Sequence, residues 1–232
     1  MSKKILIVFW GHPLFDGRCM NMMDQLLNQN HQVTVLGVGQ KLENLYYKNA
    51  KIKLFDKHLL SNSITKYFHY FRCVKRYIRQ AKIDVIIASD LYSMIPSVQT
   101  KAYHKAKILY DSRELYTKLA GLINKPLIQK IWASYEKKYI LKVDCVLVTA
   151  DIDKIYLQKL YHHPKIKIIK NLPGNSFLNN EPVDIKKMLH LQKDNLIFLY
   201  QGKFHNGRGI RFSIKCLSKI KNAVLVLIGD GP

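Results

Sequence analysis

The sequence predicts an α/β protein built on a Rossmann-like, doubly wound parallel sheet. Short apolar runs of strand length alternate with segments of helical period along most of the chain. Several runs, such as Val85–Ser89 and Val224–Ile228, show no polar alternation. That pattern is typical of strands covered on both faces, as in parallel sheets. Strands that alternate with helices favour βαβ units, and therefore this fold class.

The alternation fixes the expected elements in chain order. The expected strands are Ile5–Phe9, Gln32–Leu36, Ile52–Phe55, Val85–Ser89, Ile108–Tyr110, Cys145–Thr149, Ile166–Ile169, Leu196–Tyr200 and Val224–Ile228. The expected helices cover residues 18–29, 62–82, 92–104, 126–142, 151–161 and 208–220.

Composition and charge narrow the class of protein. The 232 residues carry 38 Lys and Arg against 16 Asp and Glu, a net charge of +22, and 48% are hydrophobic, which excludes disorder. No apolar run approaches the roughly 18–20 residues of a membrane span. The run at Ile5–Phe9 is too short for a signal peptide. The scattered cysteines Cys19, Cys73, Cys145 and Cys216 favour reduced thiols and a cytoplasmic location over zinc or disulfide frameworks.

A domain boundary is expected near residues 171–190, where Asn, Pro and Gly gather. We expect an N-terminal Rossmann-like domain over 1–172, a linker over 173–192 and the first β-α-β of a second Rossmann-like domain over 193–232. One β-α-β unit cannot cover both faces of its strands. The chain is therefore expected to stop within an incomplete second domain.

Two loops of the first domain follow strands, where open α/β sheets bind ligands. In the first, Gly17 lets a ligand approach the backbone, and Arg18 stands at a helix N-terminus, where anions are favoured. The alternative is an ordinary loop with a solvated arginine. In the second, Asp111, Arg113 and Glu114 could position hydroxyls or take a proton. The alternative there is a capped turn with Arg113 paired to Glu114.

A third loop lies between the expected strand and helix of the second domain. Glycines at 202, 207 and 209 expose backbone amides, and Lys203 and Arg208 place two cations near a helix N-terminus. This combination suits a diphosphate. It lacks the Gly-Lys-Ser/Thr of a P-loop, so nucleotide hydrolysis is not indicated. The alternative is a glycine-rich turn with solvated cations.

The expected helix at Lys66–Lys82 is basic and holds no acidic residue. Aromatic and aliphatic side chains share one face of this helix. The basic side chains lie on its remaining surface, and Phe68 lies among these basic side chains. Such a helix suits an anionic membrane surface. The alternative is a helix packed on the sheet with a solvated basic face, and single-stranded nucleic acid is a third option without a supporting fold signature. His162 and His163 precede a proline and are expected at the surface.

Several segments carry a resemblance to a known family. They are Phe15–Cys19 with His31–Leu36, Leu109–Tyr116 (Leu-Tyr-Asp-Ser-Arg-Glu-Leu-Tyr), Glu136–Thr149, Ile168–Pro173, Gln201–Ile210 and Leu227–Pro232. In order and spacing they resemble the group-1 (family 4) retaining glycosyltransferases of the GT-B fold.

The resemblance implies transfer of a sugar from a nucleotide-diphosphate donor to an acceptor, with retention of configuration and without an obligatory metal or other cofactor. The first domain would hold the acceptor and the second the donor. The donor-binding residues implied are Gly17, Arg18, Gly202, Lys203, Arg208 and Gly229. The catalytic residues implied, near the acceptor and the reacting sugar, are Asp111, Arg113 and Glu114.

Two departures from the family pattern bear on activity. Arg113 stands where the family has a histidine, and the family's Glu-x7-Glu motif has no counterpart within the 232 residues. A complete donor site is therefore not expected from this chain alone. The expected role is in bacterial surface-polysaccharide or glycolipid synthesis, at the inner face of the cell membrane. The alternative is a non-catalytic or split-subunit module that holds an acceptor or an anionic membrane and needs a partner chain.

Overall fold

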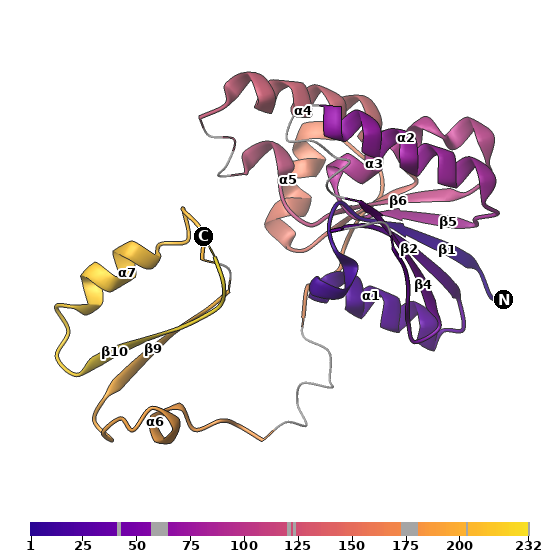
Figure 1. Cartoon of the computed structure of the whole chain (residues 1–232). Coiled ribbons are helices and arrows are strands. Elements are labelled where there is room, and N and C mark those ends of the chain that lie inside the picture. The colour runs from indigo at the N-terminus through magenta and orange to yellow at the C-terminus, as the bar shows by residue number, and fades with distance from the viewer. Residues whose placement is uncertain are drawn as a thin grey trace. The chain divides into compact units, whose positions relative to one another are not determined.

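The structure is a computed structural model that describes residues 1–40, 43–56, 65–119, 122, 124–172, 181–202 and 204–231. The chain divides into two compact units, Met1–Gly174 and Asn175–Pro232, which are shown in Figure 1. Residues 62–64 of an expected helix, residues 173–180 of the expected linker and Lys203 lie outside the described residues.

Unit 1 is built on a single sheet with the strand order β3-β4-β2-β1-β5-β6-β7-β8. Neighbouring strands are parallel, except that β3 pairs with β4 in antiparallel register. The strands are β1 (Lys4–Val8), β2 (Gln32–Gly39), β3 (Glu43–Tyr47), β4 (Ala50–Asp56), β5 (Val85–Ala88), β6 (Lys107–Ser112), β7 (Cys145–Val148) and β8 (Ile166–Ile168). The predicted α/β class with a mostly parallel sheet is confirmed.

Helices cover both faces of this sheet. In Figure 1, α1 lies on one face and α2, α3, α4 and α5 lie on the other. The α-helices are α1 (Gly17–Asn28), α2 (Thr65–Gln80), α3 (Leu91–Gln99), α4 (Pro126–Ile140) and α5 (Asp151–Tyr161). Short 3-10 turns are η1 (Pro13–Phe15), η2 (Lys101–Tyr103) and η3 (Tyr116–Lys118).

The apolar strands contribute side chains to two hydrophobic cores, one on each face of the sheet. Successive side chains of a strand point to opposite faces. Leu6 and Val8 of β1 therefore join the core under α2–α5, while Ile5 and Ile7 join the core under α1. Fully covered strands of this kind need apolar residues at every position, which is the pattern that the sequence shows.

Unit 2 contains a parallel pair of strands, β9 (Leu196–Gln201) and β10 (Ala223–Ile228), with α7 (Ile210–Leu217) between them. A short helix, α6 (Ile185–Met188), precedes β9. Large apolar side chains stay exposed on this unit, including Phe198 of β9, Phe212 of α7 and Ile228 of β10.

Three local features differ from the sequence-based expectation. β3 was not expected, because Glu43–Tyr47 is an edge strand whose side chains alternate in burial rather than forming an apolar run. α6 is a single turn, too short to show a helical period. His163 is not at the surface but 1% exposed: its Nδ1 accepts from the amide of Lys165, and its Nε2 lies 3.2 Å from the carbonyl oxygen of Val143. Because both nitrogens have partners, burial costs little.

Candidate functional site

The candidate site of unit 1 lies where the parallel strands end. The chain leaves β1 toward β2 on one side and continues from β5 toward β8 on the other, so the strand order reverses between β1 and β5. Open α/β sheets bind ligands outside the carboxyl ends of the strands at such a switch point. The loops after β1, β5 and β6 meet this edge and carry the residues described below.

Arg18 and Asp111 form a buried ion pair at this edge. The guanidinium Nη2 lies 2.5 Å from Oδ1 of Asp111, and Nε donates to Oδ2 at 2.9 Å. The remaining Nη1 donates to the carbonyl oxygen of Ile169 at 2.7 Å. The side chains are 6% and 0% exposed. The pair therefore joins the first turn of α1, the end of β6 and the residue after β8.

A second ion pair extends the first. Arg113 donates through Nη1 and Nη2 to Asp16, whose carboxylate also caps α1 by accepting from the amide of Cys19 at 2.7 Å. The guanidinium of Arg113 lies 4.6 Å from the ring centre of Phe9, and its Nε, 3.6 Å from Asp111, is buried without a hydrogen bond. Arg113 thus pairs with Asp16 rather than Glu114, and α1 begins at an internal carboxylate.

The structure places the other predicted residues of unit 1 on the outside of this network. Glu114 is exposed, and its backbone oxygen accepts from the hydroxyl of Ser112 at 3.2 Å. Gly17 is exposed as the first residue of α1, and nothing lies within 4 Å of where its Cβ would stand. Arg18, Asp111, Arg113 and Gly17 are therefore brought together, with Glu114 beside them as the exposed carboxylate.

Asp90 also lies at this edge of the sheet, although no sequence motif pointed to it. It is 3% exposed, its Oδ2 accepts from the amide of Trp10 and its Oδ1 from the amide of Ser93, both at 2.6 Å. Burial raises the pKa of Asp90 to about 6, against these hydrogen bonds and the charge of Arg113. Asp90 thus ties the loop after β1 to the start of α3. The available signal was a carboxylate directly after the strand run Val85–Ser89.

An aromatic cluster surrounds Asp90. Tyr67 stacks on Trp10 at 5.3 Å between ring centres and on Tyr92 at 5.0 Å, and Trp132 meets Tyr92 edge-on at 4.8 Å. Burial raises the pKa of the Tyr67 and Tyr92 hydroxyls, and the nearby Asp90 carboxylate contributes. The cluster draws on the loop after β1 and on α2, α3 and α4, and it forms an apolar wall beside the polar network.

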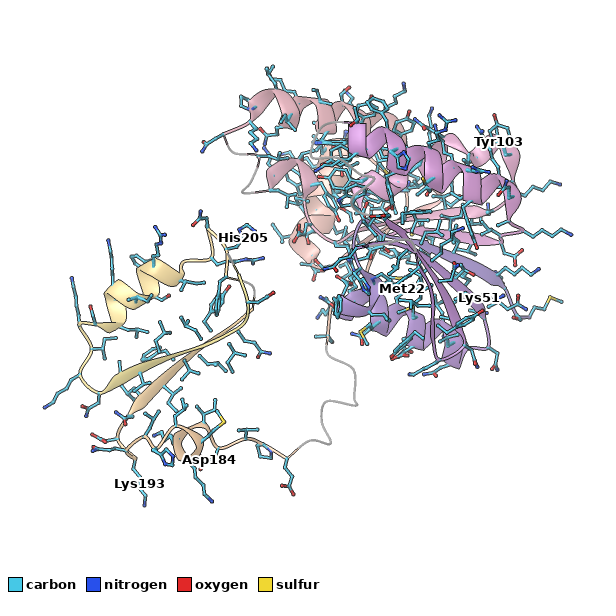
Figure 2. The ribbon with its side chains drawn as sticks, viewed as in Figure 1. Met22, Lys51, Tyr103, Asp184, Lys193 and His205 are labelled. Carbon is cyan, nitrogen blue, oxygen red and sulfur yellow. The ribbon has the colours of Figure 1, made fainter. Side chains whose placement is uncertain are left out.

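In unit 2, the loop between β9 and α7 surrounds a hollow of about 750 Å³. Its lining includes Phe204, His205, Gly207 and Arg211, and His205 is labelled in Figure 2. Gly209 begins α7 in the left-handed region (φ 74°) without a side-chain cap. The first amides of α7 therefore have no side-chain acceptor among the described residues, and such a helix start favours an anion.

The other predicted residues of this loop have distinct settings. Arg208 is exposed, while Lys203 lies outside the described residues. Gly202 donates its amide to the carbonyl oxygen of Ile228 at 2.9 Å, which closes the end of the strand pair. A Cβ at Gly229 would stand 1.8 Å from the carbonyl oxygen of Gly202, so only glycine fits there. Gly202 and Gly229 therefore shape the loop through the backbone.

Within the described ranges, no three His, Cys, Asp or Glu side chains gather in a way that could hold a metal ion. Nor does any helix in that part of the chain have the length and apolar character needed to span a bilayer.

Comparison with known proteins decides the family. Residues 18–172 match Glycosyltransferase Family 4, and that range covers more than half of the chain. The chain belongs to glycosyltransferase family 4. The family 4 match begins at Arg18 in α1 and includes Asp111 at the end of β6. No curated protein matches the sequence.

Solved structures of glycosyltransferases share the fold of this family 4 chain. Sucrose-phosphate synthase from Thermosynechococcus elongatus is similar with a TM-score of 0.77 at 16% identity, over 97% of this chain and 62% of that one. HepE from Anabaena in complex with UDP and glucose gives 0.71 at 13% identity, over 100% and 62%. A trehalose-6-phosphate protein from E. coli, bound with UDP-2-fluoro glucose, gives 0.65 at 11% identity, over 99% and 65%. The chain thus spans less than two thirds of the length of these proteins.

Proposed function

We propose that this family 4 chain takes part in transfer of a sugar from a nucleotide-diphosphate donor to an acceptor hydroxyl, with retention of configuration. In that reaction the bond from the anomeric carbon to the diphosphate oxygen breaks and a bond to the acceptor oxygen forms. The acceptor proton leaves, and the nucleoside diphosphate departs with the electron pair. The observation that carries the proposal is the family match over 18–172, which contains the Arg18–Asp111 pair.

The donor side is assigned to unit 2. Arg208, Lys203 and the uncapped start of α7 would hold the diphosphate, while Gly202 and Gly229, also predicted as donor-binding residues, would shape the loop around it. Positive charge and free amides at this point stabilise the charge that develops on the leaving phosphate. No bound cation or other cofactor is needed for that role. Structures similar in fold carry UDP or UDP-glucose, which supports a nucleotide sugar as donor.

The acceptor side is assigned to the β1–β5–β6 edge of unit 1. Glu114 is the exposed carboxylate there and is the candidate for contact with the acceptor hydroxyl or the reacting sugar. Asp111 and Arg113 are committed to buried pairs, so their proposed contribution is to fix the shape and charge of the edge. Gly17 and Arg18 were both predicted to face the donor phosphate. Gly17 leaves open space for it at the start of α1, whereas Arg18 is buried in its pair with Asp111 and would contribute by fixing that helix start.

The acceptor class and location are proposals of the same kind. We infer a glycan or lipid-linked acceptor of surface-polysaccharide synthesis and a cytoplasmic protein that associates peripherally with the inner face of the cell membrane. The basic residues of the Lys66–Lys82 segment and the net charge of +22 support contact with anionic lipid.

Additional elements that pack on unit 2 are proposed to complete the donor site. The strands of unit 2 leave Leu196, Phe198 and Leu227 at least 40% exposed, as expected of a sheet that further elements would cover. Those elements would come from a longer form of the chain or from a partner chain. A non-catalytic module that holds an acceptor or a membrane for such a partner is the alternative function. Turnover by the 232-residue chain alone would exclude that alternative.

The donor assignment is tested by nucleotide binding to the full chain. Isothermal titration with UDP, GDP and ADP should detect one of them. Arg208→Gln should lower its affinity about tenfold, because a hydrogen bond to a charged group is lost. Lys215→Gln, which removes an exposed cation further along α7, is the matched control and should bind like the wild type. Equal affinity of the two variants, or no binding of any nucleotide, would overturn the assignment.

A further inference from the structure

The outer face of α4 is apolar and uncovered. Leu127, Ile128, Ile131 and Tyr135 are 75%, 40%, 50% and 37% exposed. At the 100° per residue of an α-helix they fall within an arc of about 100°. The same helix buries Trp132, so its packing on the sheet uses a different side. We call these four residues the α4 apolar arc.

The outer face of α2 is basic, with Arg72, Arg76 and Arg79 exposed and Lys75 half-buried. Arg72, Lys75, Arg76 and Arg79 line a shallow hollow of about 400 Å³ together with Gln80. Each of these four cations, called the α2 cation stripe, lies three or four residues from two of the others. Like charges at that spacing repel and destabilise a helix. Among the described residues, no carboxylate forms an ion pair with any of them.

Further groups extend the stripe rather than neutralise it. Phe68 precedes it on the same side of α2 and is 65% exposed. Lys53 of β4 lies over the ring of Tyr77, and Arg79 lies 4.4 Å from the ring centre of Tyr103. Tyr103 is 63% exposed and is labelled in Figure 2. Cations beside exposed aromatic rings suit the boundary between water and lipid headgroups.

The two features belong to one layer of unit 1. α2 and α4 lie on the same face of the sheet (Figure 1), and the rings of Tyr67 and Trp132 join them at 4.9 Å. These rings belong to the aromatic cluster that surrounds Asp90. The layer therefore reaches the edge of the sheet where the candidate acceptor site lies.

We propose that the α2 cation stripe and the α4 apolar arc together dock unit 1 onto an anionic bilayer. The stripe attracts acidic headgroups, each cation contributing on its own, while the arc enters the boundary with the acyl chains. An anionic membrane matches both the uncompensated positive charge and the exposed aliphatic side chains. A nucleic acid would account for the charge but leave the α4 apolar arc unexplained. This inference rests on the proposed function in one respect: docking would bring a lipid-linked acceptor to the candidate acceptor site.

Co-sedimentation of the full chain with vesicles tests the inference. The chain should bind vesicles of phosphatidylcholine with phosphatidylglycerol and leave pure phosphatidylcholine vesicles unbound. Arg72→Gln/Arg76→Gln/Arg79→Gln should lower partitioning by at least about tenfold and flatten its dependence on salt. Lys215→Gln/Lys219→Gln/Lys221→Gln removes the same charge from exposed positions of unit 2 and should change little.

The α4 apolar arc is tested separately. Leu127→Gln/Ile131→Gln should lower partitioning by about tenfold while leaving the salt dependence unchanged, because it removes only apolar contact. Tyr46→Gln, at an exposed position of β3 on the far edge of the sheet, is the control. Circular dichroism checks that each variant is folded.

Several outcomes would overturn the inference: equal binding to neutral vesicles, wild-type binding by both the α2 and the α4 variants, or RNA affinity that the α2 variant loses while vesicle binding persists. Nucleotide binding is measured on the same samples. Vesicle binding without nucleotide binding would leave the docking inference standing and remove the proposed function. The reverse result would remove the docking inference and the proposed membrane association, and it would leave the donor assignment standing.

Discussion

Arg18 and Asp111 lie 93 residues apart in the chain and form a buried ion pair through two guanidinium nitrogens. Arg18 also reaches the backbone of Ile169, so a single side chain links the ends of three segments of unit 1. Neither residue is solvated, with exposures of 6% and 0%. The pair is therefore a structural element of the candidate site, and its loss should be felt in the stability of unit 1.

Arg18→Met should lower the free energy of unfolding of unit 1 by about 3 kcal/mol or more, because it leaves the Asp111 carboxylate buried without its main partner. The double variant Arg18→Met/Asp111→Asn should recover part of this loss, since the uncompensated charge is gone. Urea unfolding followed by tryptophan fluorescence measures the change, because Trp10 and Trp132 both lie in unit 1.

The exposed pair of Lys48 and Asp24 provides the comparison. Their side chains are 58% and 30% exposed, so Lys48→Gln should cost much less stability than Arg18→Met. If Arg18→Met were as mild as Lys48→Gln, the Arg18–Asp111 pair would not hold the site together.

Asp90 should make unit 1 less stable as the pH rises through its pKa. Burial raises that pKa from an ordinary value of 3.8 to about 6, so between these values the folded chain keeps a proton that the unfolded chain has released. Stability then falls with rising pH, and the contribution of Asp90, about 3 kcal/mol, is present below pH 4 and lost above pH 6. The raised pKa of buried Glu136 acts in the same direction, and the lowered pKa of Asp144 acts in the opposite one.

The Asp90 contribution is isolated by comparing wild type with Asp90→Asn across pH 4–7. The amide does not titrate, so the stability of the variant should fall less steeply between pH 4 and 6. It should also be offset downward, because an amide cannot accept from both Trp10 and Ser93 as the carboxylate does. Parallel curves for the two proteins would refute the assignment.

Glu136 should be replaceable by glutamine but not by leucine. Its two carboxylate oxygens accept from the hydroxyls of Tyr110 at 2.9 Å and Tyr161 at 2.7 Å, and all three residues are buried. Glu136→Leu leaves two hydroxyls without acceptors and should cost about 2–6 kcal/mol, while Glu136→Gln keeps partners for both. Adding Tyr161→Phe to the leucine variant should restore part of the loss in urea unfolding. A leucine variant as stable as the glutamine variant would contradict this reading.

Gly229→Ala should open the end of the strand pair in unit 2. The new Cβ would stand 1.8 Å from the carbonyl oxygen of Gly202, so the ends of β9 and β10 must separate. The amide of Gly202, bonded to Ile228, should then exchange its hydrogen faster by NMR. Gly207→Ala, also at positive φ but with open space around it, should leave that amide protected. The same rate in both variants would show that close approach is unimportant here.

Local pattern determined most of what could be predicted about the fold. Continuous apolar runs identify strands covered on both faces, and the structure confirms β1, β5 and β7 close to the expected bounds. The edge strand β3 was not predicted, because only one of its faces is covered and its apolar pattern is therefore weaker.

The candidate site was predicted in part, because its loops follow strands and carry charged residues. What the sequence could not show was pairing across long separations. The sequence offered the adjacent Glu114 as a partner for Arg113. In the structure Arg113 pairs with Asp16, which lies 97 residues away in the chain. The burial of His163 was missed for the same reason, because one of its partners, the carbonyl of Val143, lies 20 residues away in the chain.

Hydrogen exchange of the full chain with and without UDP, GDP or ADP tests the central claim most directly. The account predicts slower exchange in the segment from Gly202 to Phe212 with the cognate nucleotide, and unchanged exchange over α2 and α4. Protection confined to unit 1, or no protection with any of the three nucleotides, would contradict the assignment of unit 2 as the donor side.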